Sequence, residues 1–171
     1  MHNRQGGRGG GGGGGERRGV QLSDLDPALT EMSRKVIGCG IEVHKILGPG
    51  YEPDVYLKAL CLELDEEGVS YERDHSFEID FDGDIVGHTV ATLYVGGRFL
   101  VEVLARVGEV GAGERNRLRA QLRAADCELG LIVNFGERRL KDGLVRVLNY
   151  DKLNPRDDEY EDDDADEGDA G

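Results

Sequence analysis

A single carboxylate, Glu102, lies within the apolar segment FLVEVLARV, residues 99–107. Side chains alternate along a β-strand, so Glu102, Leu104 and Arg106 are expected to share one face. A carboxylate in such a strand could hold a divalent cation for phosphodiester hydrolysis. That reaction needs at least two carboxylates around the cation and a group such as lysine near the attacking water. Because a leucine stands two residues after the carboxylate, Glu102 alone is not expected to hold Mg²⁺.

Other residue types capable of chemistry are scattered along the chain. His44, His75 and His88 each stand singly, and no Cys and His spacing matches a zinc site. The glycine-rich segment at residues 6–15 lacks the Lys-Ser/Thr ending of a phosphate-binding loop, so a nucleotide site is not expected. The cysteines are widely spaced and odd in number, which predicts reduced, buried thiols; they are Cys39, Cys61 and Cys127.

The elements that must position Glu102 follow from the periodicity of apolar residues. Asp26 and Pro27 are a capping residue and a first-turn proline, and helical spacing continues to the GPG at residues 48–50. A second helix is predicted from about Pro53 to Glu67. The period then changes to two, which predicts strands. The remaining predicted elements are strands at 76–81, 85–95 and 99–107, a helix at 113–126, and strands at 129–135 and 143–150.

These elements predict an α/β domain with a mixed sheet. The first three strands are joined by short turns and form an antiparallel meander. The segment LGLIVNF, residues 129–135, lacks alternation, which predicts a strand buried on both faces after a helical crossover. The expected architecture is therefore a mixed sheet flanked by helices.

Four separated segments carry a resemblance to a known family. They are VIGCGIEVHKILGPGYEPDVYLKAL, FLVEVLARV, LGLIVNFG and LKDGLVRVLN, and they lie in the same order between residues 36 and 149. Together they resemble the bacterial GxxExxY proteins, a branch of the PD-(D/E)XK nuclease-like superfamily. The resemblance implies a restriction-endonuclease-like fold.

The motif that gives these proteins their name is incomplete in this chain. Gly50 and Tyr56 stand at the glycine and tyrosine positions, but the glutamate position is occupied by Pro53. Two carboxylates, Glu52 and Asp54, flank that proline.

The catalytic positions that the resemblance implies are also substituted. The metal-binding aspartate of the second strand falls on Thr92, ten residues before Glu102. The Glu-x-Lys pair of the third strand reads Glu102-Val103-Leu104, and a glutamine on the following helix falls on Arg117. Of these positions and Pro53, only Glu102 keeps the family residue.

Two interpretations of the site follow. In the first, the chain is a catalytically degenerate member that keeps the fold as a non-enzymatic binding or interaction module, with no cofactor. Glu102 is then a half-buried carboxylate paired with Arg106 or Arg117. In the second, it is a metal-dependent nuclease with relocated ligands, in which Glu102 binds Mg²⁺ or Mn²⁺ with Asp54 or Glu52. Arginine stays protonated, so Arg106 could replace the lysine only as a charge and not as a base.

Composition divides the chain into three parts. Residues 1–22 are a Gly/Arg-rich leader, residues 23–153 are the expected folded domain, and residues 154–171 are an acidic tail; both ends are expected to be disordered. The formal net charge is −14, and residues 20–156 still carry −7.

An acidic domain is a poor binder of phosphate backbones, so a protein partner is expected rather than nucleic acid. The best candidate for a basic patch is ERNRLRAQLR, residues 114–123. The glycine-rich start lacks an apolar signal-peptide core and no run is long enough to span a membrane, so a cytoplasmic protein without membrane contact is expected.

Overall fold

The computed structural model describes residues 24–153. The predicted leader at residues 1–22 and the predicted acidic tail at residues 154–171 lie outside the described residues. The elements, in chain order, are α1 (Pro27–Leu47), α2 (Pro53–Glu66), β1 (Tyr71–Phe81), β2 (Asp84–Val95), β3 (Phe99–Leu104), α3 (Ala112–Ala125), β4 (Leu129–Asn134), the 3₁₀ turn η2 (Leu140–Gly143), β5 (Leu144–Leu148) and the short α4 (Tyr150–Leu153).

The first helix begins and ends as its sequence predicts. Asp26 caps α1, because its side-chain Oδ1 accepts a hydrogen bond from the Ala28 backbone N–H at 2.9 Å, and Pro27 occupies the first helical position. Gly48 ends the helix with φ of 66°, a conformation that glycine adopts without steric cost. The second helix likewise starts at Pro53.

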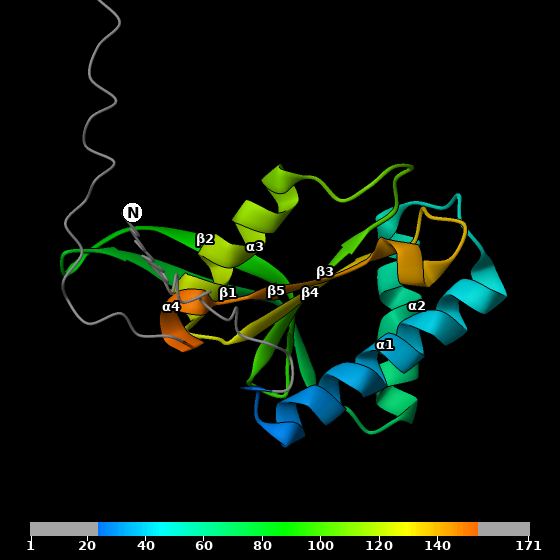
Figure 1. Ribbon diagram of the computed structural model, residues 1–171, viewed down its shortest axis with the longest axis horizontal. Coiled ribbons are helices and arrows are strands. Elements are labelled where there is room, and N and C mark those ends of the chain that lie inside the picture. The colour runs from blue at the N-terminus through cyan, green and yellow to red at the C-terminus, as the bar shows by residue number, and fades with distance from the viewer. Residues whose placement is uncertain (1–23, 154–171) are drawn as a thin grey trace, which may run out of the picture.

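Five strands form one mixed sheet in the order β1-β2-β3-β4-β5. The first three strands pair antiparallel, β3 and β4 pair parallel, and β4 and β5 pair antiparallel. The parallel pair is possible because α3 carries the chain back across one face of the sheet, as Figure 1 shows. The predicted meander, crossover helix and mixed sheet are therefore confirmed, and the architecture is restriction-endonuclease-like.

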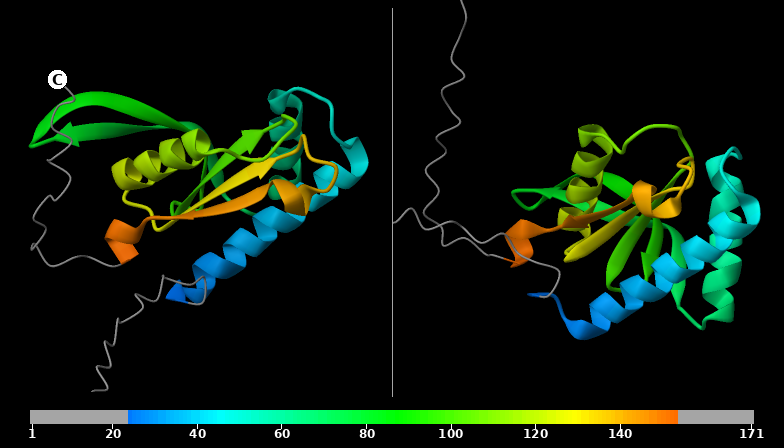
Figure 2. Two further views of the ribbon diagram at one scale, coloured as in Figure 1. Left: turned by 45° about the horizontal axis from the view of Figure 1, so that its top comes forward. Right: turned by 45° about the vertical axis from the view of Figure 1, so that its right-hand side comes forward.

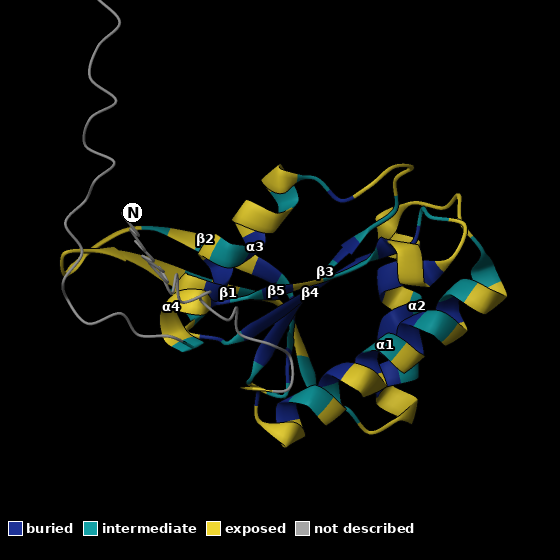
Figure 3. Ribbon diagram, in the orientation of Figure 1, coloured by how far each residue is buried: buried dark blue, intermediate teal, exposed yellow. Residues whose placement is uncertain are grey.

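Each face of the sheet has its own apolar core. Helices α1 and α2 pack with Phe99, Val101 and Val103 of β3. On the other face, α3 packs with Leu100 of β3 and Ile132 of β4. Figure 3 shows the buried centre of the sheet between these helices. The alternation predicted for residues 99–104 is thus confirmed, and it places Glu102 on the α3 face.

Close packing of α3 on the sheet depends on one glycine. A Cβ at Gly130 of β4 would lie 2.8 Å from the Leu118 side chain, so a larger residue would require the Leu118 side chain or the helix to shift. All six residues of β4 are buried, which agrees with the prediction of a strand covered on both faces.

Three predicted boundaries were wrong. The strand predicted at 99–107 ends at Leu104, the strand predicted from 76 begins at Tyr71, and the last strand ends at Leu148. Beyond the rest of the sheet, β1 and β2 continue as a long hairpin with mostly exposed residues (Figures 1 and 2).

Two further expectations concern the described residues. The three cysteines are free and buried, as predicted. No helix between residues 24 and 153 has both the length and the apolar character that crossing a membrane requires.

Candidate functional site

The candidate site is built around Glu102 and Thr92, which lie on neighbouring strands. The antiparallel register pairs Leu93 of β2 with Val101 of β3, and the same register sets Thr92 opposite Glu102. The Thr92 hydroxyl donates a hydrogen bond of 2.7 Å to Oε1 of Glu102. The side chains of residues 92 and 102, ten residues apart in sequence, are therefore in direct contact. One oxygen of the Glu102 carboxylate is engaged by Thr92, at the position for which the resemblance implies an aspartate.

Burial dominates the electrostatics of Glu102. Removal from water raises the pKa of this carboxyl group, because the charged form loses hydration. The Thr92 hydrogen bond and the positive charge of Arg117 on α3 act in the opposite direction, and the negative charge of Asp74 raises the pKa further. The net pKa lies above the ordinary value of a glutamate. The surroundings of Glu102 therefore disfavour its ionised form.

Asp74 is a residue that sequence reasoning missed. The pairs Arg73–Leu93 and His75–Ala91 flank it, which places Asp74 of β1 opposite Thr92 on the side away from Glu102. Its φ of 51° is unusual for a residue other than glycine, and aspartate tolerates it better than most. The only indication in the sequence is that Asp74 interrupts the strand pattern before His75.

The carboxylates that flank Pro53 serve a different part of the molecule. Pro53 begins α2, which packs on the opposite face of the sheet from Glu102. Asp54 pairs with Lys58 at 3.0 Å and with Arg73 at 3.9 Å. Within the described residues, no contact joins Asp54 or its neighbour Glu52 to Glu102. The predicted grouping of Glu102 with Asp54 or Glu52 is therefore not formed in the structure.

Gly50 and Tyr56, which carry the resemblance to the GxxExxY motif, lie in the connection between α1 and α2 and at the start of α2, respectively. The Tyr56 hydroxyl donates to the Gly48 carbonyl at 2.5 Å and accepts from the Tyr51 backbone N–H at 3.1 Å. The Tyr56 ring stacks on Phe135, with centroids 4.7 Å apart. Gly50 adopts φ of 119° in the connection between α1 and α2. These contacts fix that connection to the end of β4.

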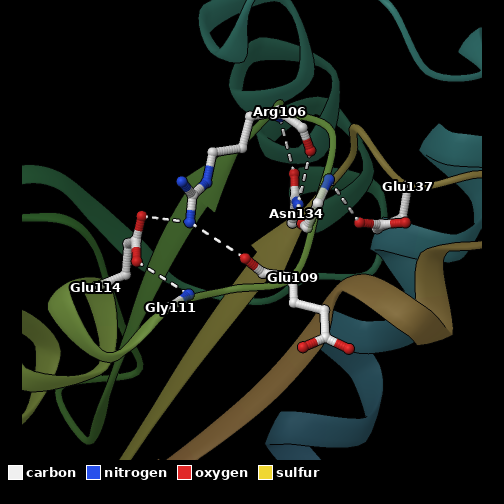
Figure 4. A network of polar contacts seen from close by, with 7 residues as sticks. Arg106, Glu109, Gly111, Glu114, Asn134 and Glu137 are labelled. Carbon is white, nitrogen blue, oxygen red and sulfur yellow. Dashed lines mark hydrogen bonds and ion pairs between the residues drawn. The ribbon is translucent and has the colours of Figure 1, made fainter.

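The prediction that Arg106 lies beside Glu102 was wrong. Because β3 ends at Leu104, alternation does not extend to Arg106. Figure 4 shows its guanidinium contacting the Glu114 carboxylate and the Glu109 backbone carbonyl. Arg106 therefore neither pairs with Glu102 nor supplies charge at the lysine position, which Leu104 occupies half-buried.

The loop after β3 is organised by a buried amide that sequence reasoning also missed. Asn134, the last residue of β4, is fully buried. Its side-chain oxygen accepts from the backbone N–H groups of Arg106 and Gly136, and its amide nitrogen donates to the carbonyls of Arg106 and Gly108. Figure 4 shows the two hydrogen bonds to the Arg106 backbone. All hydrogen-bonding capacity of this side chain is used, so it holds the loop and is not available to a ligand.

A groove of about 500 Å³ lies between α3 and the β1–β2 hairpin. Arg117, predicted as a site position, lines it together with Arg123, while Glu78 and Asp80 line the hairpin wall. Arg117, whose positive charge lowers the pKa of Glu102, therefore also lies at an accessible surface. Within the described residues, no ion pair shorter than 4.0 Å joins Glu102 to an arginine, so the predicted pairing with Arg117 acts only through longer-range charge.

The donor set around Glu102 is small. No group of three His, Cys, Asp or Glu side chains suitable for a metal ion occurs between residues 24 and 153. The residues present are one half-buried carboxylate, a hydroxyl bonded to it, a leucine and a more distant aspartate. Hard cations prefer several oxygen ligands, so this set does not fit a resident Mg²⁺.

Comparison with known proteins identifies one family. The model of the PD-(D/E)XK nuclease superfamily matches residues 30–147, which is more than two thirds of the chain. No curated protein and no solved structure matches the chain.

Proposed function

Because this chain belongs to the PD-(D/E)XK nuclease superfamily, we propose that it is a catalytically degenerate member that uses the fold as a non-enzymatic binding module. We place it near the GxxExxY branch, since Gly50 and Tyr56 keep the spacing of that motif. Its three free, buried cysteines fit the reducing environment of the cytoplasm.

One observation carries the proposal: the hydroxyl of Thr92 donates to Glu102 where a second carboxylate would share a cation. A cation between the two residues would have to displace that hydrogen bond and would gain a single charged ligand. Burial already raises the pKa of Glu102, which further weakens its use as an anionic ligand.

The magnitude of the expected loss supports a non-enzymatic role. Removing one preorganised electrostatic group commonly reduces a rate by roughly 10²- to 10³-fold. Here the aspartate and lysine positions hold Thr92 and Leu104. Although such losses do not multiply simply, the remaining rate would lie close to the uncatalysed background.

The projecting hairpin favours a protein partner over nucleic acid. Its exposed apolar residues are Ile79, Phe81, Ile85, Val86 and Val90. Acidic residues alternate with them, namely Glu78, Asp80, Asp82 and Asp84. An acidic surface repels phosphates, whereas it complements a protein surface that combines apolar and basic side chains. We therefore assign the hairpin as the contact surface for a protein of that character.

Hydrolysis assays test the absence of catalysis. The full chain and Glu102→Gln are incubated with Mg²⁺ or Mn²⁺ and labelled single- and double-stranded DNA and RNA. We expect equal, background cleavage from both proteins. Cleavage by the natural chain that Glu102→Gln abolishes would refute the proposal.

Affinity capture with Phe81→Ser tests the hairpin as a contact surface. The variant should lose a specific partner, while the control Ile46→Ser, at an exposed position on α1, should retain it.

The second candidate function is a metal-dependent nuclease with a relocated ligand, and Asp74 is the observation that favours it. This residue lies opposite Thr92, and its charge acts on Glu102. Under this alternative, Asp74 and Glu102 share a cation, and Asp74→Asn abolishes cleavage as fully as Glu102→Gln does. Under the degenerate interpretation, Asp74→Asn leaves cleavage at background.

A further inference from the structure

A row of arginines follows one flank of α3. Arg115, Arg119 and Arg123 recur every four residues, so they lie above one another on successive turns. Arg115 and Arg123 are exposed and Arg119 is half-buried. Within residues 24–153, none of the three forms an ion pair shorter than 4.0 Å. We refer to these three residues as the arginine row.

The acidic residues nearest the ends of the arginine row are engaged elsewhere. At the start of α3, the Glu114 carboxylate binds the Arg106 guanidinium. At its end, the Asp126 carboxylate lies 3.3 Å from Lys152 Nζ. These two carboxylates are therefore not available to pair with the arginine row. Glu78 and Asp80, across the groove from Arg123, form no ion pair shorter than 4.0 Å with the row within residues 24–153.

The described chain ends beside the same flank. Lys152 of α4 also donates to the Asp126 carbonyl at 2.6 Å, and Asp126 follows Arg119 by seven residues, or about two helical turns. Residues 154–171 leave the domain from this point with ten acidic residues and one arginine. The arginine row extends roughly 16 Å from there, at 1.5 Å per helical residue. Eighteen residues can reach about 60 Å, so length does not limit contact.

We propose that residues 154–171 dock on the arginine row as an intramolecular polyanion. Each exposed ion pair is weak and sensitive to salt, but attachment to the domain keeps the segment at a high effective concentration. The docked segment screens α3 from other polyanions, including nucleic acid. This inference does not depend on the proposed function, because it assigns no role to Glu102 or Thr92.

A spin label measures this contact directly. The three natural cysteines are buried, so a nitroxide on Ala170→Cys in the full chain labels that position selectively. In about 0.02 M salt, we expect NMR amide signals of residues 115–123 to lose more than about half of their intensity, and to recover in about 0.5 M salt, where charges are screened within roughly 4 Å. Equal broadening over the whole domain would overturn the proposal.

A charge-matched pair of variants identifies the surface. Replacing Arg115, Arg119 and Arg123 by glutamine should abolish the broadening of α3. Replacing Arg34, Lys35 and Lys141 by glutamine removes the same charge from exposed positions on α1 and η2. This variant should keep the broadening of α3. Contact that persists in the first variant, or that moves to the basic leader, would also overturn the proposal.

Neutralising the acidic segment gives an independent readout. With the ten acidic residues of 157–171 replaced by Asn and Gln, the affinity for heparin should increase at least about fivefold, because the arginine row is uncovered. The additional Arg115, Arg119 and Arg123 substitutions should remove that gain. An unchanged heparin affinity after neutralisation, or a gain that survives these substitutions, would contradict docking on the row.

Discussion

The two faces of the sheet differ in what they contain. On the α1 and α2 face, Leu93, Phe99 and Leu131 are completely buried in one continuous apolar core. On the α3 face, a smaller cluster surrounds Leu100 and Ile132, and it adjoins Glu102, Thr92 and an open groove. The same strand, β3, contributes alternate residues to both. One face therefore secures the fold, while the polar positions of the other can change without removing the core.

The core face contains an aromatic contact at Tyr56, whereas the α3 face has a half-buried carboxylate, Glu102, hydrogen-bonded to Thr92. Tyr56 still stacks on Phe135 and fixes the α1–α2 connection. Thr92 and Leu104 suit a half-buried strand, since a β-branched residue and an apolar residue pack well there. Under the proposed function, this contrast is how a nuclease fold keeps its architecture while its catalytic positions change.

The largest expected effect compares one side chain from each face. Phe135→Ala should reduce the free energy of unfolding by about 3–5 kcal/mol, because it opens a cavity against Tyr56. Leu104→Ala on the other face should cost less than about 2 kcal/mol, since Leu104 is half-buried. Urea denaturation measures both, with Phe135→Leu as a milder core variant if Phe135→Ala does not fold. Equal losses would contradict the distinction between the faces.

The next effect concerns the buried amide that ties the loop after β3. Asn134→Ala leaves the backbone groups of Arg106 and Gly136 without their partner and should cost about 2–3 kcal/mol. Hydrogen exchange should accelerate mainly at residues 104–111. Asn134→Asp is a second variant, because it keeps the acceptor but sets a buried carboxylate oxygen against the carbonyls of Arg106 and Gly108. Acceleration spread evenly over the domain would argue against a local role for Asn134.

A smaller effect is expected at the Thr92 hydroxyl. Thr92→Val keeps the shape of the side chain but removes the hydrogen bond to Glu102, and should cost about 1 kcal/mol. Since that bond lowers the pKa of Glu102, its loss should raise the pKa further, which carboxyl NMR titration can detect. Thr89→Val, whose hydroxyl accepts from Gln121, is the matched control and should leave the pKa of Glu102 unchanged. A fall in that pKa in Thr92→Val would contradict the assigned hydrogen bond.

The smallest effect should appear in Glu102→Gln. Burial raises the folded-state pKa of Glu102, so ionisation opposes folding. Below the ordinary glutamate pKa of about 4.3 this penalty is absent, and it develops as pH rises through the elevated folded pKa. Relative to the natural chain, Glu102→Gln should therefore gain stability between pH 4 and pH 7, by about 1 kcal/mol or less. Thermal unfolding at both pH values measures the difference, and a relative loss at pH 7 would reverse the assigned sign.

The sequence predicted the architecture well because its strongest patterns are local. Asp26, Pro27 and Gly48 specify the limits of α1, and the lack of alternation at residues 129–135 indicates a strand covered on both faces. The end of β3 could not be read in the same way. The apolar pattern continues to Val107. The backbone N–H and carbonyl of Arg106, however, form hydrogen bonds with the side chain of Asn134, which is distant in sequence.

The site was predicted in part for a similar reason. The resemblance implied neighbouring site positions at Thr92 and Glu102, and the two side chains are in contact because a tight turn fixes the register of the two strands. Asp74 was missed because its place opposite Thr92 depends on the pairing of β1 along a long hairpin. Arg106 was misplaced because strand alternation was extended two residues beyond the end of β3.

Mn²⁺ titration followed by NMR tests the central claim most directly. Paramagnetic broadening reports where the ion binds, and the variant with the ten acidic residues of 157–171 replaced by Asn and Gln is used so that ions held by that segment do not contribute. We expect the amide signals of residues 91–93 and 101–103 to broaden no more than that of buried Leu29 in α1, which packs across the opposite face of the sheet. Selective broadening at Thr92 and Glu102 that Glu102→Gln abolishes would contradict the claim, because it would show that the cation site is retained.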